Sequence, residues 1–233
     1  MASKKPFSEQ DPADDLSSKM RDYLAQVYRL SEGHPHYVST SSLADLVDVS
    51  APAVNRMVTR LKEQGLLEHE PYQGVRLTEA GQREALKELR RHRIAEAFLV
   101  KVMGFGWHEV HDEANRISQA LSETITERMA AMAGNPTHCP HGEPIPSPEG
   151  VLPPMNDQLL SEIPAGTDVE ITRVRTRESD RLEYMAALGL TPGTRLNVLH
   201  VAPFNGPIQL KVGSEYRIVG HNLAELIRVK TVV

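Results

Sequence analysis

Cysteine, long apolar runs and an apolar leader are scarce or missing in this sequence of 233 residues. Its single cysteine, Cys139, excludes an internal disulfide and fits a reducing compartment. No apolar run approaches the ~20 residues that a membrane span needs, and the N-terminal segment has no apolar signal core. We therefore expect a cytoplasmic protein that does not associate with a membrane.

The net charge of −5 at first argues against a nucleic-acid partner, but the charge is unevenly distributed. Counting Lys and Arg against Asp and Glu gives −2 for residues 1–18, +2 for 19–93, −7 for 94–165 and +2 for 166–233. The acidic segment also holds histidines, a combination that attracts cations. The flanking segments remain free to meet an anion such as DNA.

The first third of the chain predicts short helices followed by a hairpin. Apolar residues at helical spacing mark a helix over residues 19–30, and a short helix follows the cap at 39–41. After a tight connection, Ser50 caps a third helix with Pro52 in its first turn, a favoured place for proline. Residues 66–77 then indicate two strands, and this order is typical of a winged helix-turn-helix.

The third helix has a polar, basic face of the kind that enters a major groove. Val54, Val58 and Leu61 fall on one side, which leaves small, amide and guanidinium side chains facing outward. The candidate base contacts are Pro52, Ala53, Asn55 and Arg56, and the candidate phosphate contacts are Ser39, Thr40, Ser42, Arg60 and Arg76. The alternative is a three-helix module for protein contacts, which the polar and basic character of this face disfavours.

Residues 91–115 predict a helical hairpin that carries candidate metal ligands. His92 and Glu96 are four residues apart on one face of a long helix, which Gly104 breaks. The next helix carries His111 in its first turns, so the hairpin can bring this imidazole beside the first two groups. Two imidazoles and a carboxylate suit a divalent transition metal, and a solvated His–Glu pair is the alternative.

The second helix of the hairpin is expected to run unbroken to a stop at residues 134–136. Its apolar positions are too many for a lone hairpin to bury, and a second copy of the chain is the simplest partner. A homodimer would set two recognition helices ~34 Å apart, which is one DNA turn and the spacing that a palindromic operator requires.

Beyond the hairpin, the chain changes character twice. A proline-rich loop over residues 137–150 holds Cys139 and His141. In one interpretation Cys139 is a buried loop residue and His141 is its solvated neighbour. In the other, both are further ligands for a metal bound at the acidic segment. From Leu159 onward, short alternating runs are separated by glycines, with one helix over residues 180–188. This pattern predicts a small closed β-barrel.

The order of these motifs resembles the diphtheria toxin repressor and manganese transport regulator family, from Lys19 to near the C-terminus. The matching motifs are RHRIAE at 91–96, VHDEA at 110–114 and CPHG with PIP at 139–146. The resemblance implies a homodimeric, metal-activated transcriptional regulator that senses Fe(II) or Mn(II), usually as a repressor, here of metal-uptake genes. It also implies an FeoA-like C-terminal domain.

The resemblance implies ligands as well. His92, Glu96 and His111 match one of the family's two metal positions. In some members the C-terminal domain completes this position, and the matching segment here holds Glu178 and Asp180.

In one manganese-responsive branch of the family, a Glu at the place of Glu96 works with a Cys-x-His pair, which Cys139 and His141 match. Oxygen and imidazole ligands suit Mn(II) and Fe(II), whereas a thiolate favours Zn(II). The resemblance favours Mn(II) as the cofactor.

The family's other metal position departs from the pattern. Its places for Cys or Glu, for Glu and for His hold Asn115, Ser118 and Gln119. Its N-terminal carboxylate is Asp22, and Ala25 stands where some members carry a further Glu. One carboxylate with neutral amides predicts weak binding at this position. We therefore expect sensing to rest on Glu96, Cys139, His141 and a carboxylate of the C-terminal domain, with Asp180 as the first candidate. His92 and His111 are expected to form or share the neighbouring site.

Two other functions fit parts of this pattern. A metal-dependent hydrolase could use the same ligands, although they lack the His-Glu-x-x-His arrangement and an evident spare general base. A DNA-binding regulator whose metal is structural or absent would bind its operator with an affinity that chelation does not change. The sequence predicts a mainly α fold with β in four segments: a mobile tail (1–18), the winged helix-turn-helix (19–79), a metal-binding and dimerisation domain (80–157) and the small barrel (158–233).

Overall fold

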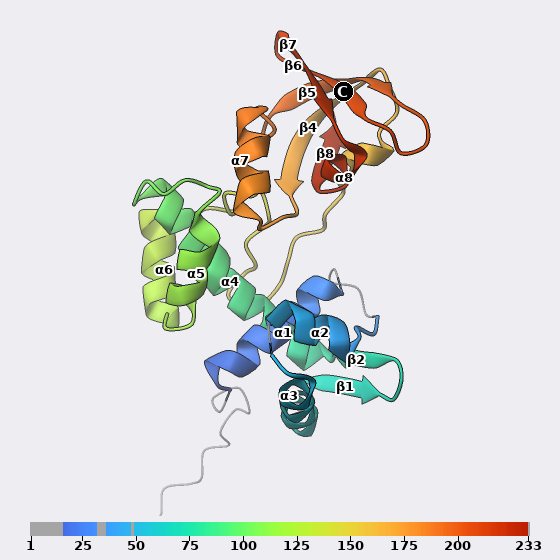
Figure 1. Cartoon of the computed structure of the whole chain (residues 1–233). Coiled ribbons are helices and arrows are strands. Elements are labelled where there is room, and N and C mark those ends of the chain that lie inside the picture. The colour runs from blue at the N-terminus through green and yellow to red at the C-terminus, as the bar shows by residue number, and fades with distance from the viewer. Residues whose placement is uncertain (1–15, 32–35, 48, 233) are drawn as a thin grey trace, which may run out of the picture. The chain divides into compact units, whose positions relative to one another are not determined.

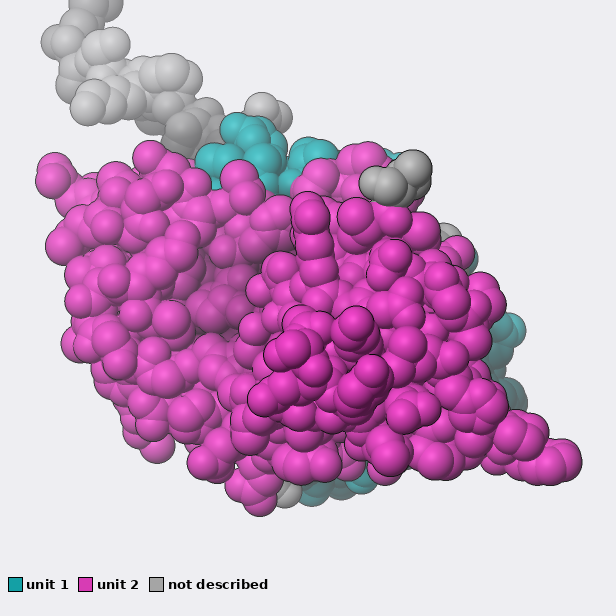
Figure 2. All heavy atoms as spheres, turned by 90° about the horizontal axis from the view of Figure 1, so that it is seen from above, with its two compact units in different colours: residues 1–90, 146–151 teal, residues 91–145, 152–233 magenta. Residues whose placement is uncertain are grey.

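The computed structural model describes residues 16–31, 36–47 and 49–232 (Figure 1). The chain forms two compact units, unit 1 with residues 1–90 and 146–151, and unit 2 with residues 91–145 and 152–233 (Figure 2). Most of the expected tail, part of the first helix end and Asp48 of the tight connection lie outside the described residues. Among the described helices, none is long and apolar enough to cross a membrane.

Unit 1 contains the predicted winged helix-turn-helix. Its elements are α1 (Ser18–Leu30), α2 (Thr40–Val47), α3 (Ala51–Glu63) and the antiparallel pair β1 (Leu67–Glu70) and β2 (Gly74–Leu77). Leu24, Leu43 and Leu61 are fully buried in one core. Leu16 is buried in the same core and Ser17 caps α1, so ordered structure begins before residue 19.

Local structure at the helix ends explains where α3 begins and ends and where α4 begins. Ser50 has extended backbone before α3, and Gly65 adopts φ +70° after it, a conformation that glycine takes without strain. The Thr78 hydroxyl donates to the Gly65 carbonyl at 2.7 Å and accepts from the Gly81 amide at 3.0 Å. Thr78 therefore ties the end of α3 to the first turn of α4.

The helical hairpin differs from its prediction in one respect. Helix α4 (Glu79–Lys101) is long and continuous as expected, but two helices follow it, α5 (Val110–Ser118) and α6 (Glu123–Met132). The expectation of one unbroken second helix was wrong. Ser122 takes extended backbone, and its hydroxyl accepts from the Ile125 amide at 3.3 Å, so it starts a new helix.

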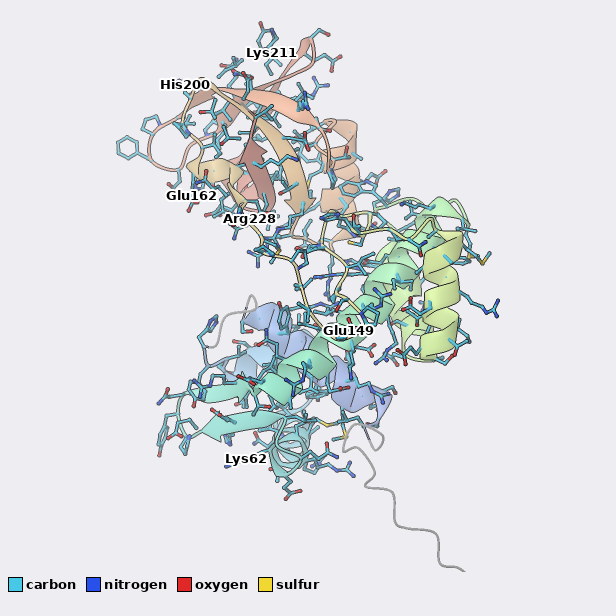
Figure 3. All side chains as sticks on the ribbon, turned by 180° about the vertical axis from the view of Figure 1, so that it is seen from behind. Lys62, Glu149, Glu162, His200, Lys211 and Arg228 are labelled. Carbon is cyan, nitrogen blue, oxygen red and sulfur yellow. The ribbon has the colours of Figure 1, made fainter. Side chains whose placement is uncertain are left out.

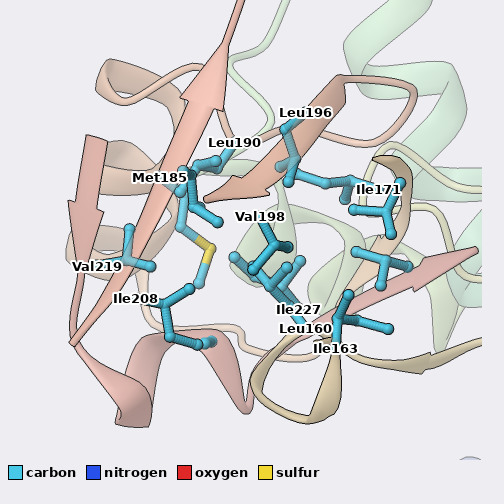
Figure 4. Close-up of a cluster of buried hydrophobic side chains, with 14 of the residues drawn as sticks. Leu160, Ile163, Ile171, Met185, Leu190, Leu196, Val198, Ile208, Val219 and Ile227 are labelled. Carbon is cyan, nitrogen blue, oxygen red and sulfur yellow. The ribbon is translucent and has the colours of Figure 1, made fainter. Parts of the chain in front are cut away.

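The C-terminal part of unit 2 is a six-stranded antiparallel sheet with two short helices. Its elements are β3 (Gln158–Leu159), a 3-10 turn (Leu160–Glu162), β4 (Thr167–Val174), α7 (Ser179–Ala187), β5 (Arg195–Val201), β6 (Ile208–Val212), β7 (Glu215–Val219), α8 (His221–Ala224) and β8 (Ile227–Thr231). Ile171, Met185 and Val198 lie fully buried in its core (Figure 4).

The predicted closure of this sheet into a barrel was wrong. The strand order is β3-β8-β4-β5-β6-β7, and among the described strands β3 and β7 are opposite edges that do not pair with each other. Strand β3 has only two residues, too few to close the ladder against β7. Strand β7 pairs with β6 and with no other described strand, which makes it an edge of the sheet.

Candidate metal centre and nucleic-acid interface

Two imidazoles from helices of unit 2, those of His92 and His111, lie against one carboxylate oxygen of Glu96. Glu96 Oε1 lies 2.6 Å from Nδ1 of His111 and 2.9 Å from Nε2 of His92. The two imidazole nitrogens are 3.3 Å apart. Ligand atoms that bind one divalent ion at ~2.1 Å are separated by about 3.0–3.4 Å. These three residues, the helical triplet, therefore have nearly the spacing of one face of a metal site.

Burial excludes a solvated His–Glu pair. Glu96 is 1% exposed and His92 is 4% exposed. Burial by itself would raise the pKa of Glu96, but the surrounding histidines, led by His92, hold it well below its usual value. Burial lowers the pKa of His111 despite the opposing effect of Glu96. These directions favour an ionised Glu96 carboxylate and a neutral His111 imidazole, two of the protonation states that metal ligation requires.

Glu96 also takes part in a second set of donor atoms, through its other oxygen. Its Oε2 lies 3.7 Å from Nδ1 of His141, and that nitrogen lies 3.9 Å from Sγ of Cys139. Cys139 and His141 are both buried. Glu96, Cys139 and His141, the loop triplet, have one donor atom each within 4.8 Å of one another, and the same holds for the helical triplet. One carboxylate therefore belongs to both sets.

The orientation of His141 is set by Trp107. Nε2 of His141 donates a hydrogen bond to the Trp107 carbonyl oxygen at 2.7 Å, which leaves Nδ1 as the ring nitrogen that faces Glu96 and Cys139. The His141 ring also stacks on the Trp107 ring, with centroids 5.5 Å apart. Sequence reasoning missed this contact because a backbone carbonyl gives no residue signal.

The thiol of Cys139 is protonated in the metal-free protein. Burial raises its pKa well above the usual value, and the negative charge of Glu96 adds to that effect. A thiolate rather than a thiol binds metals, so a metal held by Cys139 would displace the thiol proton.

Two predicted ligands lie outside both triplets. Glu178 and Asp180 are exposed at the start of α7, and Arg181 Nε donates to Glu178 Oε2 at 2.8 Å. Neither belongs to a cluster of metal-binding groups in the described part of the chain. Their role as ligands stays a prediction.

The residues at the family's other metal position offer few ligands. Asp22 accepts a hydrogen bond from Gln26 Nε2 at 2.9 Å. Ser118 is buried, and its hydroxyl donates to the Asn115 carbonyl at 3.4 Å. Weak metal binding there stays a prediction.

Helix α3 presents the predicted base contacts away from the core of unit 1. Val54, Val58 and Leu61 are buried, as the periodicity predicted. The exposed candidates on this helix are Pro52, Asn55, Arg56 and Arg60, and Ala53 is half-buried. Lys62, near the C-terminal end of α3 (Figure 3), is a further exposed cation that sequence reasoning had not named.

Three candidate phosphate contacts outside α3, Ser39, Ser42 and Arg76, already have partners within the fold. The Ser39 hydroxyl accepts from the Ser42 amide at 3.0 Å, so it caps α2, whose first residue is Thr40. The Arg76 guanidinium pairs with Glu68 and lies over the Tyr37 ring. Nε and Nη2 of Arg76 donate to Glu68 Oε2, so a phosphate would compete with Glu68 for these two groups.

An exposed basic recognition helix and a buried centre of His, Glu and Cys define a metal-responsive DNA-binding regulator. Comparison with known families agrees with this class. Residues 15–75 match the iron dependent repressor N-terminal DNA binding domain, residues 78–147 match its metal binding and dimerisation domain, and residues 158–231 match the FeoA domain.

Known proteins resemble the chain over nearly its whole length. The iron-dependent repressor IdeR of Mycobacterium tuberculosis is 32% identical over 222 residues, which cover 90% of this chain and 96% of that protein. The diphtheria toxin repressor of Corynebacterium efficiens is 25% identical over 196 residues, which cover 80% and 85%. The chain belongs to the iron-dependent repressor family.

Solved structures of the same family have the same fold. A manganese-dependent transcriptional repressor in complex with manganese is 34% identical, with a TM-score of 0.85 over 91% of this chain and all of that one. ScaR with bound Zn²⁺ is 29% identical, with a TM-score of 0.78 over 91% and 99%. The protein is therefore a metal-dependent DNA-binding transcriptional repressor with a dimerisation domain, and an enzymatic function is not favoured.

Proposed function

We propose that this protein is a manganese-activated repressor that binds a palindromic operator as a homodimer and controls metal-uptake genes. The observation that carries the proposal is the position of Glu96, whose two carboxylate oxygens face two different sets of buried donor atoms. A buried carboxylate among histidines is costly unless a positive charge balances it. A divalent cation supplies that charge.

The two triplets would hold the metal. His92, His111 and Glu96 offer nitrogen and oxygen donors from α4 and α5, and Cys139 and His141 add donors from the proline-rich loop. Asp180 or Glu178 of the C-terminal domain would complete the coordination. When bound, the metal neutralises charge in the acidic segment 94–165 and links its helices to its loop.

Manganese is proposed over iron and zinc for two reasons. Imidazole and carboxylate donors, which form most of the set, suit Mn(II) and Fe(II), whereas the single thiolate favours Zn(II). The structural neighbour with 34% identity is a manganese-dependent repressor, and IdeR, at 32%, is iron-dependent. The donors therefore disfavour Zn(II) but do not separate Mn(II) from Fe(II), and the similarity to the manganese-dependent repressor favours Mn(II).

DNA recognition would use the exposed face of α3. Asn55 and Arg56 carry the amide and guanidinium groups that read base edges, while Pro52 and Ala53 suit thymine methyl groups. The remaining contacts, which hold phosphates, are Ser39, Thr40, Ser42, Arg60 and Arg76. Two copies of α3 separated by ~34 Å would read the two halves of a palindrome.

Dimerisation would use the apolar surface of α6. Ile125 is 48% exposed and Met132 is 65% exposed, an unfavourable arrangement for an isolated chain. Metal binding would favour one arrangement of the dimer. A coupling of ~1–3 kcal/mol changes DNA affinity ~5- to 150-fold, which is enough for a switch.

Fluorescence anisotropy on a duplex selected from random DNA tests the proposal. Mn(II), Fe(II) and Zn(II) are titrated at one fixed salt concentration, because phosphate contacts make affinity strongly salt-dependent. A chelator is then added. We expect affinity to rise at least several-fold with Mn(II), to fall on chelation and to be indifferent to Mn(II) in Glu96→Ala.

Glu113→Ala is the matched control. Glu113 lies in the same acidic segment, but its carboxylate pairs with Arg116 outside both triplets. This variant should respond to Mn(II) as the parent does. Tight DNA binding that is indifferent to every metal would contradict the proposal and identify a regulator whose metal is structural or absent.

A further inference from the structure

Four charged side chains of unit 2 form a second polar centre beside the metal ligands. Arg93 Nη2 donates to Glu143 Oε2, and Arg173 Nη1 donates to Glu143 Oε1, both at 3.1 Å. Arg173 also forms a two-pronged pair with Asp157, through Nε at 2.8 Å and Nη2 at 3.0 Å. This ion network joins α4, the proline-rich loop, the segment before β3 and strand β4.

The ion network is buried and its charges balance. The side chains of Arg93, Arg173 and Asp157 are 10–11% exposed, and that of Glu143 is 21% exposed. Two guanidinium groups face two carboxylates. Such networks add little net stability compared with apolar packing, but they fix geometry, because the Arg173 fork donates to both Asp157 oxygens in one orientation.

Glu143 is rigidly connected to the loop ligands. The amide of Cys139 donates to the Glu143 carbonyl at 2.9 Å, and the amide of Gly142 donates to the Cys139 carbonyl at 2.9 Å. Residues 139–143 therefore form one tight turn. Whatever holds the Glu143 side chain also holds Cys139 and His141.

Strand β4 supports the same turn through its backbone. The Val174 amide donates to the His141 carbonyl at 2.9 Å. Gly142 has φ +84°, and a Cβ there would lie 2.0 Å from the Thr172 carbonyl oxygen. The turn can approach β4 this closely only because residue 142 is glycine.

We propose that the ion network positions the loop triplet for metal binding, with Glu143 and Arg173 as positioning residues. Helix α4 supplies both Arg93 and, three residues later, Glu96. Arg93 also donates to the Pro144 carbonyl at 2.6 Å, so its contacts with Glu143 and Pro144 together hold the loop ligands at a fixed separation from Glu96. This inference rests on the proposed function, because it takes Cys139 and His141 as metal ligands.

Co(II) is the probe for this inference, because a cobalt–thiolate bond has its own charge-transfer absorption. Glu143→Gln keeps the size of the side chain and removes its charge, and Arg173→Lys keeps the charge and removes the fork. For each variant we expect ~10- to 100-fold weaker Co(II) binding, the range for residues that support metal ligands. The thiolate absorption per bound cobalt should also fall, an effect that a general loss of stability would not produce.

Glu170→Gln is the matched control. Glu170 also lies on β4, but its carboxylate pairs with Lys230 at 2.8 Å and with Arg195 at 3.4 Å, neither of which belongs to the ion network. It should bind Co(II) with parental affinity and absorption. Thermal unfolding of the metal-free proteins identifies a variant that does not fold. If Glu143→Gln does not fold, the Co(II) affinity and absorption of Arg173→Lys test the inference.

The outcomes distinguish two claims: that Cys139 is a metal ligand, and that the ion network positions the loop triplet. A parent without thiolate absorption, or with absorption that survives Cys139→Ala, rejects Cys139 as a ligand and the inference with it. If Cys139→Ala removes the absorption and both network variants keep parental affinity and absorption, the inference alone is overturned.

Discussion

Replacing Glu96 by Gln is the sharpest single perturbation of the metal centre. Gln keeps the volume of a side chain that is 1% exposed, so the packing of α4 is preserved. It removes the one carboxylate that the helical and loop triplets share. Because support residues alone cost 10- to 100-fold in metal affinity, the loss of a shared ligand should cost at least ~100-fold.

The thermal shift that metal produces follows from this loss. At a free Mn(II) concentration of ~100 times the parental Kd, binding stabilises the folded parent by ~2.7 kcal/mol. For a chain of this size that corresponds to a rise in Tm of about 5–11 °C. At the same concentration a ~100-fold weaker variant gains only ~0.4 kcal/mol, or about 1–2 °C.

Circular dichroism melts of metal-free and Mn(II)-loaded protein measure this difference. Glu113→Gln, which removes a carboxylate of α5 outside the triplets, should keep the full shift. The reasoning is refuted if Glu96→Gln keeps the parental rise in Tm, because Glu96 would then not be a ligand in either triplet.

Three further predictions follow from individual residues. Mn(II) binding should release a proton from Cys139, because burial raises the pKa of this thiol, and affinity should therefore rise with pH; calorimetry in two buffers of different ionisation enthalpy should detect about one proton fewer released by Cys139→Ala than by the parent. Arg56→Ala should cost ~1–3 kcal/mol at one base position, whereas Arg60→Ala should weaken all sequences equally and lower the salt slope by ~1, which binding to mismatched duplexes over a salt series distinguishes. Gly142→Ala should destabilise the protein by at least the ~1–2 kcal/mol of its left-handed conformation, since the added Cβ also meets the Thr172 carbonyl, and an unchanged midpoint of urea unfolding would contradict this.

Sequence periodicity was sufficient for most of the individual elements. The buried positions of α3, the two strands of the wing and the strands from β4 to β8 follow patterns that depend on neighbours a few residues away. The same local logic identified His92 and Glu96 as a pair on one helix face. Periodicity failed at Ser122, because the apolar pattern continues there although Ser122 caps a new helix and divides α5 from α6.

Contacts between residues far apart in the chain could not be predicted from the sequence patterns. The edges β3 and β7 leave the sheet open, although the alternating runs alone were equally compatible with closure. The ion network around Arg173 was not anticipated, because its four members are up to 80 residues apart and each resembles an ordinary surface charge.

Residue chemistry in the sequence determined that this protein has a recognition helix and a set of metal-binding side chains. Only the tertiary structure decided that Glu96 presents one oxygen to His111 and the other to His141, and that a Trp107 carbonyl orients the latter imidazole. The physical reason is that residue type and helical spacing are local properties. The convergence of donor atoms depends instead on how the helices, the loop and strand β4 pack together.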